Sequence, residues 1–129
     1  MRAGVIIIKN KQILLMKRFH NAQHYYALPG GGVEDNELPC EAAIREAREE
    51  TSLKVVLVKK FISFVDHRDN RIHLYFFVKS FTGKLKLGGI EALKNSPANH
   101  YELVWMDVKN ISKLKLYPLK IKKDILKKC

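Results

Sequence analysis

Residues 28–53, LPGGGVEDNELPCEAAIREAREETSL, carry the strongest local pattern in this 129-residue chain. Three consecutive glycines, Gly30, Gly31 and Gly32, let the backbone approach a ligand closely, because glycine has no Cβ. After a polar turn, Pro39 suits the first position of a helix, where its missing N–H needs no partner. The stretch therefore predicts a glycine loop followed by a helix that begins near residues 38–39 and ends near residues 51–52.

The helix is expected to have two distinct stripes. One is largely apolar and is predicted to face the core; it holds Cys40, Ala43, Ile44, Ala47 and Thr51. The other gathers Glu46, Glu49 and Glu50, because positions i, i+3 and i+4 are neighbours on a helix surface. On the remaining arc, Glu41 and Arg45 are placed to pair at i, i+4.

The three carboxylates repel one another, and the helix macrodipole disfavours anions towards the C-terminal end. Three glutamates alone are most simply a solvated acidic face. Their position after a glycine-rich loop favours a metal site over a solvated face. A glycine loop followed by a helix with clustered carboxylates is an economical way to hold a divalent metal beside a phosphate chain. Clustered carboxylate oxygens without cysteine or histidine suit hard ions such as Mg²⁺ or Mn²⁺.

The same run resembles the Nudix box, which is a glycine, five residues, Glu, seven residues, then Arg-Glu-apolar-x-Glu-Glu-x-Gly-apolar. The nine fixed positions fall here on Gly31, Glu37, Arg45, Glu46, Ala47, Glu49, Glu50, Ser52 and Leu53. Only Ser52 departs, since the family has glycine there. A left-handed residue commonly ends a helix at this place, so serine should cost about 1 kcal/mol.

The resemblance covers nearly the whole chain and implies a Nudix fold. That fold belongs to the α/β (α+β) class, with a mixed β-sheet sandwiched between helices and the box as a loop–helix–loop. It also implies one domain over residues 1–129.

The resemblance further implies roles for individual residues, with Mg²⁺ (or Mn²⁺) as the cofactor. Glu46, Glu49 and Glu50 would hold the metal, and Glu49, Glu50 or Glu91 would take the proton from water; the sequence does not choose among these three. Glu37 and Arg45 would support the loop and the helix. Arg18 would meet phosphates, as would the backbone of Gly30, Gly31 and Gly32.

Apolar and alternating runs predict the other elements. Strands are expected over residues 4–8, 13–18, 25–28, 53–65, 71–81 and 102–107, with a helical turn over 108–114 and a final helix over 118–128. Residues 19–26 are expected to form a loop, and residues 83–100 a long irregular one. In the strand over 71–81, Tyr75 and Phe77 share one face and are candidates for contacting a base, although aromatic residues on strands more often serve packing.

The activity implied is metal-dependent hydrolysis of a pyrophosphate linkage in a nucleoside diphosphate derivative, with a (deoxy)nucleoside triphosphate favoured, as in MutT-like enzymes. ADP-ribose-cleaving members often carry a proline some fifteen residues past the box, and this chain has none between Pro39 and Pro97. Leu116 and Tyr117 stand where MutT-type enzymes have a base-reading asparagine. Two alternatives stay open: an RNA 5′-end pyrophosphohydrolase or decapping-type enzyme, and a non-catalytic ligand sensor.

Hydropathy and cysteine content predict the compartment in which the protein works. No apolar run approaches the ~18 residues that span a membrane, and the N-terminus has no small-residue cleavage site, so we expect no membrane partner. Two cysteines, Cys40 and Cys129, make no disulfide framework and suit a reducing cytoplasm.

The net charge of +11 is concentrated near the C-terminus, where residues 109–129 hold eight lysines against Asp124 alone. That segment keeps a nucleic-acid partner open. However, these lysines alternate with apolar residues at core-like spacing. This spacing indicates that they reflect the lysine-rich composition of the whole chain and not a nucleic-acid-binding segment. A small-molecule nucleotide is the expected partner, and the protein is expected to be a monomer or a homodimer.

Overall fold

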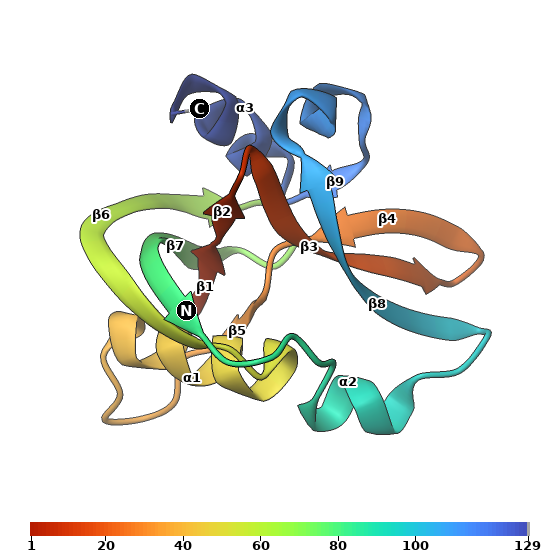
Figure 1. The fold of residues 1–129 in the computed structure, drawn as a ribbon, viewed down its shortest axis with the longest axis horizontal. Helices are drawn as coiled ribbons and strands as arrows, with labels where there is room; N and C mark the ends of the chain where they lie inside the picture. Colours follow the sequence, from red (N-terminus) through yellow and green to blue (C-terminus); the bar gives the residue numbers. More distant parts are fainter. Residues whose placement is uncertain (129) are drawn as a thin grey trace.

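The computed structural model describes residues 1–128 and has two curled β-sheets, with helix α1 at one end and helix α3 at the other (Figure 1). The expected α+β class with mixed pairing and flanking helices is confirmed, although the strands divide into two sheets instead of one. Cys129, predicted to be a free thiol, lies outside the described residues. Within the described part, no helix is long and apolar enough to cross a membrane.

The first sheet has four strands in the order β5-β1-β7-β6. Their bounds are β1 Arg2–Ile6, β5 Gly30–Gly32, β6 Lys54–Asp66 and β7 Arg71–Thr82. Strand β1 pairs antiparallel with β5 and parallel with β7, so the glycine stretch forms an edge strand beside the N-terminus. Strand β6 then pairs antiparallel with β7 as a long hairpin with bulges near Leu57.

The second sheet is ordered β2-β3-β4-β9, and β8 pairs with the other side of β3. Its strands are β2 Ile8–Lys9, β3 Gln12–His20, β4 Gln23–Ala27, β8 Asn99–Asp107 and β9 Leu116–Tyr117. The 3₁₀ helix η1 Val108–Lys113 and helix α3 Leu119–Lys128 complete the chain. The predicted strand over residues 4–8 is thus split, because Ile7 lies between β1 and β2.

The two sides of the structure have separate apolar cores. The core under α1 includes Val5, Leu14, Ala43 and Leu53, and the core under α3 includes Ile6, Leu15, Ile121 and Ile125. Successive strand residues point to opposite faces. Neighbours such as Val5 and Ile6 therefore serve different cores.

Helix α1 Pro39–Thr51 begins and ends where the sequence predicts, but its buried face differs. Ala42 and Glu50 are buried beside Ala43, Ala47 and Thr51, whereas Ile44 is 39% exposed. The predicted apolar stripe is therefore rotated towards β5. Ile44 loses its core position because the helix turns its glutamate side to the glycine strand.

Two predicted loops contain regular structure. Residues 19–26 form the tip of the β3–β4 hairpin, in which Asn21 and Ala22 take positive φ values. The segment over 83–100 contains the short helix α2 Gly89–Lys94 and the first residues of β8. The loop predictions were wrong at these places because polar strands and one-turn helices lack a clear hydrophobic period.

Candidate functional site

The middle of α1 lies against the glycine strand β5. The backbone N–H of Gly30 donates a hydrogen bond of 3.1 Å to Oε1 of Glu50. A side chain at Gly31 would overlap the carboxylate of Glu46 and would have to displace it from Arg45, so glycine at this position permits the close approach. These contacts bring two predicted metal ligands against two of the three predicted phosphate-binding glycines.

Arg45 is the centre of the polar network on this side of α1. Its guanidinium donates to both carboxylate oxygens of Glu37, at 2.8 and 3.1 Å, and to Oε1 of Glu46 at 3.0 Å. It also donates to Oε2 of Glu49 at 3.2 Å and to the carbonyl of Gly32 at 3.0 Å. The hydrogen bond from Arg45 lowers the pKa of Glu37, and Glu37 in turn raises the pKa of Arg45. The guanidinium therefore joins the acidic turn, the helix and the glycine strand.

The expected Glu41–Arg45 pair is replaced by other contacts. Glu41 instead accepts a hydrogen bond of 2.8 Å from the backbone N–H of Leu38 at the start of the helix. An orphan N–H at a helix start needs an acceptor. Glu41 therefore bonds to Leu38 and Arg45 bonds to Glu37, so the two side chains do not pair.

The three glutamates do not form one solvated stripe. Glu50 is only 6% exposed; the side chain of Glu46 is 15% exposed and that of Glu49 is 52% exposed. Burial raises the pKa of Glu50, and the negative charges of Glu91 and Glu46 and a hydrogen bond with Glu46 raise it further. The Gly30 N–H opposes this shift. A buried group with such neighbours needs either a proton or a cation.

Glu91 reaches this group from α2, which follows a loop attached to the end of α1. The N–H groups of Lys86 and Gly88 donate to the carbonyls of Thr51 and Glu50, each at 3.0 Å. Ser52 adds a 2.9 Å hydrogen bond from Oγ to the carbonyl of Lys86. As predicted, Ser52 takes the left-handed conformation, with φ of 65°. The end of the helix thereby fixes the loop that carries the fourth carboxylate.

Arg18 lies on a different wall, formed by β3, β4 and β8. Its guanidinium stacks 3.7 Å from the ring centroid of Tyr101 and donates to Asn99 and to the carbonyl of His100 at 2.8 and 3.0 Å. Tyr25 lies on β4, the strand on the other side of β3, and its ring centroid is 5.8 Å from the guanidinium carbon of Arg18. The arginine is held flat against aromatic rings, and no contact joins it to the glutamates among the described residues.

Tyr75 and Phe77 point to the core under α3. Tyr75 is 6% exposed and Phe77 packs beside it, while Phe76 on the opposite face is also buried. Both faces of β7 are therefore covered, and the face with Tyr75 and Phe77, our candidates for contacting a base, belongs to the core under α3. Tyr75 still lines a cavity of about 330 Å³ between the two sheets, together with Arg2, Tyr25 and Tyr117.

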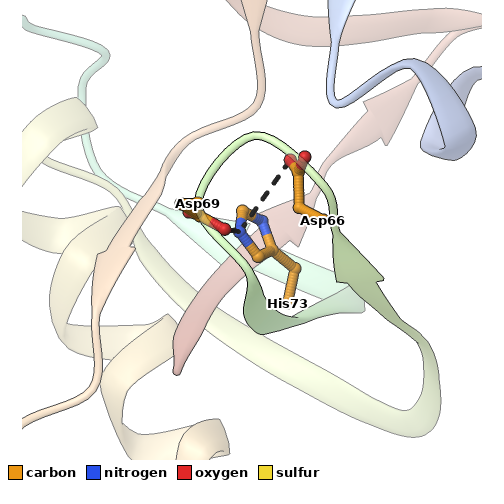
Figure 2. Close-up of side chains that lie close together, drawn as sticks. All are labelled: Asp66, Asp69 and His73. Atoms are coloured by element: carbon orange, nitrogen blue, oxygen red, sulfur yellow. Dashed lines mark hydrogen bonds and ion pairs between the residues drawn. The ribbon is translucent and has the colours of Figure 1, made fainter.

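A second polar cluster, absent from our sequence expectations, closes one end of this cavity. Asp66, Asp69 and His73 lie at the β6–β7 turn with ligating atoms within 4.8 Å of one another (Figure 2). Arg68 already neutralises Asp66 through hydrogen bonds of 2.7 to 3.2 Å, which lower the pKa of Asp66 to about 2. The guanidinium of Arg68 thus compensates negative charge in this cluster. The cluster is separate from the glutamates of α1.

The sequence signal for this cluster was the spacing of polar residues across a turn. Asp66 and Asp69 stand between the strands that we predicted over residues 53–65 and 71–81, and His73 lies on the second of them. The sequence does not show that His73 faces Asp69. In the folded hairpin His73 is 2% exposed and its Nε2 lies 3.0 Å from Oδ2 of Asp69.

Comparison with known proteins identifies similar chains. The NUDIX domain family matches residues 1–128. An ADP-ribose pyrophosphatase of Methanocaldococcus jannaschii is 34% identical over 95% of this chain and 70% of its own length. An RNA pyrophosphohydrolase of Pelagibacter ubique is 27% identical over 97% of this chain and 87% of its own length. The crystal structure of a MutT NUDIX hydrolase from Burkholderia pseudomallei superposes with a TM-score of 0.71, at 20% identity, over 97% of this chain and 95% of that one.

Proposed function

Because this chain belongs to the Nudix hydrolase family, we propose that it hydrolyses a pyrophosphate linkage in a nucleoside diphosphate derivative with a divalent metal. The observation that carries this proposal is the position of Glu50. Its buried carboxyl lies against Gly30 and beside Glu46, with the charge of Glu91 close by. We take residues 1–129 to be one Nudix domain, and its location to be cytoplasmic.

The donor set fits Mg²⁺ or Mn²⁺. Glu46, Glu49 and Glu50 offer only carboxylate oxygens, which are the ligands that these hard ions take. The negative charge of Glu46 raises the pKa of Glu50, so a cation there would relieve the repulsion between their charged forms. The bound ion would supply charge neutralisation at the phosphates and a more acidic water.

The protein's own part is to accept a proton and to hold the phosphates. A proton acceptor works best when its pKa lies near the working pH. Burial and neighbouring charges move the pKa of Glu50 upward, in that direction. Glu49 and Glu91 remain candidates for the same task, the first because it is exposed and the second because its charge acts on Glu50.

Phosphate oxygens would meet the backbone of Gly30, Gly31 and Gly32, since no side chain at these positions blocks the approach. Arg45 holds the Gly32 carbonyl and so fixes the shape of this strand. Arg18 is proposed to meet the far end of the phosphate chain. Its stacking on Tyr101 keeps the guanidinium plane fixed, which lowers the entropy lost on binding.

Among small substrates we favour a (deoxy)nucleoside triphosphate or a related nucleotide. The relative at 34% identity is named ADP-ribose pyrophosphatase. This nucleoside diphosphate sugar therefore belongs among the substrates to be assayed. Its presence there tests our expectation, drawn from the missing proline, that ADP-ribose is a poor substrate.

A triphosphorylated RNA end is the second candidate, and a specific observation favours it. Lys115 and Lys120 are exposed and lie over the rings of Tyr117 and Phe64, and Lys120 lines a cavity of about 420 Å³ together with both of these aromatic residues. A relative is also named RNA pyrophosphohydrolase. Lysines beside aromatic rings suit a single-stranded backbone with stacked bases.

The experiment is phosphate and pyrophosphate release with Mg²⁺ or Mn²⁺ across nucleoside triphosphates, ADP-ribose and triphosphorylated RNA, at two salt concentrations. A free nucleotide as substrate predicts mild salt dependence, whereas RNA predicts a steep loss of activity with salt. Glu49→Gln and Glu50→Gln should each lose several orders of magnitude in kcat.

Glu41→Gln, on the same helix, is the matched control, because its amide oxygen still accepts from Leu38 N–H. Normal activity in both Glu49→Gln and Glu50→Gln would contradict the proposed site. No turnover of any compound by the wild type, with metal bound, would favour the sensor alternative.

A further inference from the structure

The cavity between the two sheets has the size and lining of a base-binding pocket. Its volume of about 330 Å³ is lined by residues from both sheets, including Arg2, Tyr25, Tyr75 and Tyr117. The aromatic rings of Tyr25 and Tyr117 stand edge to face with centroids 5.7 Å apart. Aromatic rings of this kind can pack against a planar heterocycle, while the polar groups of the lining decide which heterocycle fits.

The polar end of the pocket is the carboxylate of Asp69, which is held in a fixed orientation. His73 Nε2 lies 3.0 Å from Asp69 Oδ2, and the backbone N–H of Arg71 donates to Oδ1 at 3.0 Å. The other imidazole nitrogen, Nδ1, lies 3.4 Å from the hydroxyl of Tyr75. An ionised carboxylate only accepts hydrogen bonds, so His73 donates from Nε2 and Nδ1 accepts from Tyr75. The chain Tyr75–His73–Asp69 therefore presents an oriented acceptor.

Asp69 retains acceptor capacity towards the pocket. A carboxylate offers about four lone-pair sites, and Arg71 and His73 use only part of them. Its side chain is 34% exposed, so a ligand can reach it. Asp66, the other carboxylate of the turn, is instead 7% exposed and occupied by Arg68. Only Asp69 of the two is placed to read a ligand.

A carboxylate prefers a partner with two adjacent donors, because it accepts them side by side. Among the common nucleobases, guanine presents such a pair, N1–H and the 2-amino group. Adenine and cytosine place a ring acceptor next to their amino donor, and uracil flanks its single N–H with two carbonyls. These bases would set a lone pair against the carboxylate, which is a repulsive arrangement and leaves a carboxylate oxygen without its donor.

We propose that this pocket binds the guanine base of the substrate and that Asp69 is the residue that selects it. The inference rests on the proposed function for the phosphate end of the molecule. Arg2 lies across from both Gly32 and His73 in the sheet register. Neighbouring strands are about 4.8 Å apart, so a base beside His73 has its phosphates one or two strands away, at Arg2 and the glycine strand.

The test measures binding of GMP, IMP, AMP, CMP and UMP to the full chain by calorimetry, without metal. GMP should bind roughly 10- to 100-fold more tightly than UMP, the range expected for hydrogen bonds to a charged group. IMP, which keeps N1–H but lacks the 2-amino group, should fall between them. Ribose 5-phosphate shows how much affinity comes from the phosphate alone. Equal binding of all five nucleotides, or a preference for another base, would overturn the proposal.

Two variants sharpen the test. Asp69→Asn should lose the preference for GMP, because an amide offers one donor and one acceptor in place of two acceptors. Asp35→Asn removes the same charge from an exposed turn and should leave the preference intact. Retained GMP selectivity in Asp69→Asn, with a normal circular dichroism spectrum, would contradict the assignment.

Hydrolysis assays separate this inference from the proposed function. Selective GMP binding without turnover of any triphosphate would support the pocket and contradict the hydrolase proposal. Turnover of GTP and UTP at equal kcat/KM, together with equal binding of GMP and UMP, would support the hydrolase and contradict the role of Asp69.

Discussion

The carboxyl group of Glu50 accepts a hydrogen bond from the backbone N–H of Gly30 over 3.1 Å, although the two residues are 20 positions apart. This bond connects the last turns of α1 to the edge strand β5. It also holds an acidic side chain at 6% exposure, next to the carboxyl of Glu46. An ionisable group in such a place affects stability as well as chemistry.

Removing the charge of Glu50 should stabilise the metal-free protein at alkaline pH. Its pKa in the folded chain lies above the ordinary value of 4.5. The stability associated with its protonated form is therefore complete below pH 4.5 and is lost as the pH rises through the folded-state pKa. We expect Glu50→Gln to raise Tm relative to wild type at pH 8 in a chelator, and to differ little at pH 4.5. Added Mg²⁺ should raise the Tm of the wild type only; a variant destabilised at both pH values would contradict this.

Glu91→Gln should move the acid limb of the activity profile to lower pH. The negative charge of Glu91 contributes to the raised pKa of Glu50, so its removal lets Glu50 ionise at lower pH. We expect kcat to fall by roughly 10²-fold or more if Glu91 also accepts the proton from water. Rate measurements from pH 5 to 9 check both effects. An unchanged acid limb would show that the two carboxyl groups do not interact.

Arg45→Lys should disrupt the glycine strand although the positive charge remains. Lysine cannot reproduce the fork that meets Glu37 at two oxygens while also reaching Gly32. We expect kcat/KM to fall at least about tenfold, and stability to fall by roughly 1–2 kcal/mol. Urea unfolding and substrate kinetics check this. Arg48→Lys, exposed on the same helix, is the control and should change neither quantity.

Ser52 offers a comparison between two small substitutions. Ser52→Gly relieves the left-handed backbone but loses the bond to Lys86, so its net effect on stability should be within about 0.5 kcal/mol of zero. Ser52→Ala loses the bond and keeps the strain, so it should be less stable than Ser52→Gly by about 1 kcal/mol. Chemical denaturation of the three proteins measures this difference. Equal stability of the glycine and alanine variants would exclude backbone strain as the cause.

The parts of the structure that the sequence predicted well are those that depend on local chemistry. Pro39 and the left-handed Ser52 bound α1 where the capping pattern placed them. Glu37 and Arg45, for which the resemblance implied supporting roles at the loop and the helix, are joined by a hydrogen bond. Each of these features depends on residues within about two turns of the helix.

The features that sequence analysis missed depend on contacts between distant segments. The buried position of Glu50 arises because β5 lies against the polar side of α1, which a helical wheel cannot show. Tyr75 and Phe76 are both buried because the first sheet has a core on each side, one shared with α1 and the other with the second sheet and α3. His73 meets Asp69 only when the β6–β7 hairpin has closed.

The parallel pairing of β1 with β7 has a consequence for synthesis on the ribosome. Strand β1 pairs with β5 and β7, and β3 pairs along its whole length with β8, whose residues run from 99 to 107. The first twenty residues therefore emerge long before two of their partner strands, β7 and β8, do. Nascent chains shorter than about 110 residues should expose unpaired, strongly apolar strands, so this protein should fold late and depend on chaperones when translation is slow.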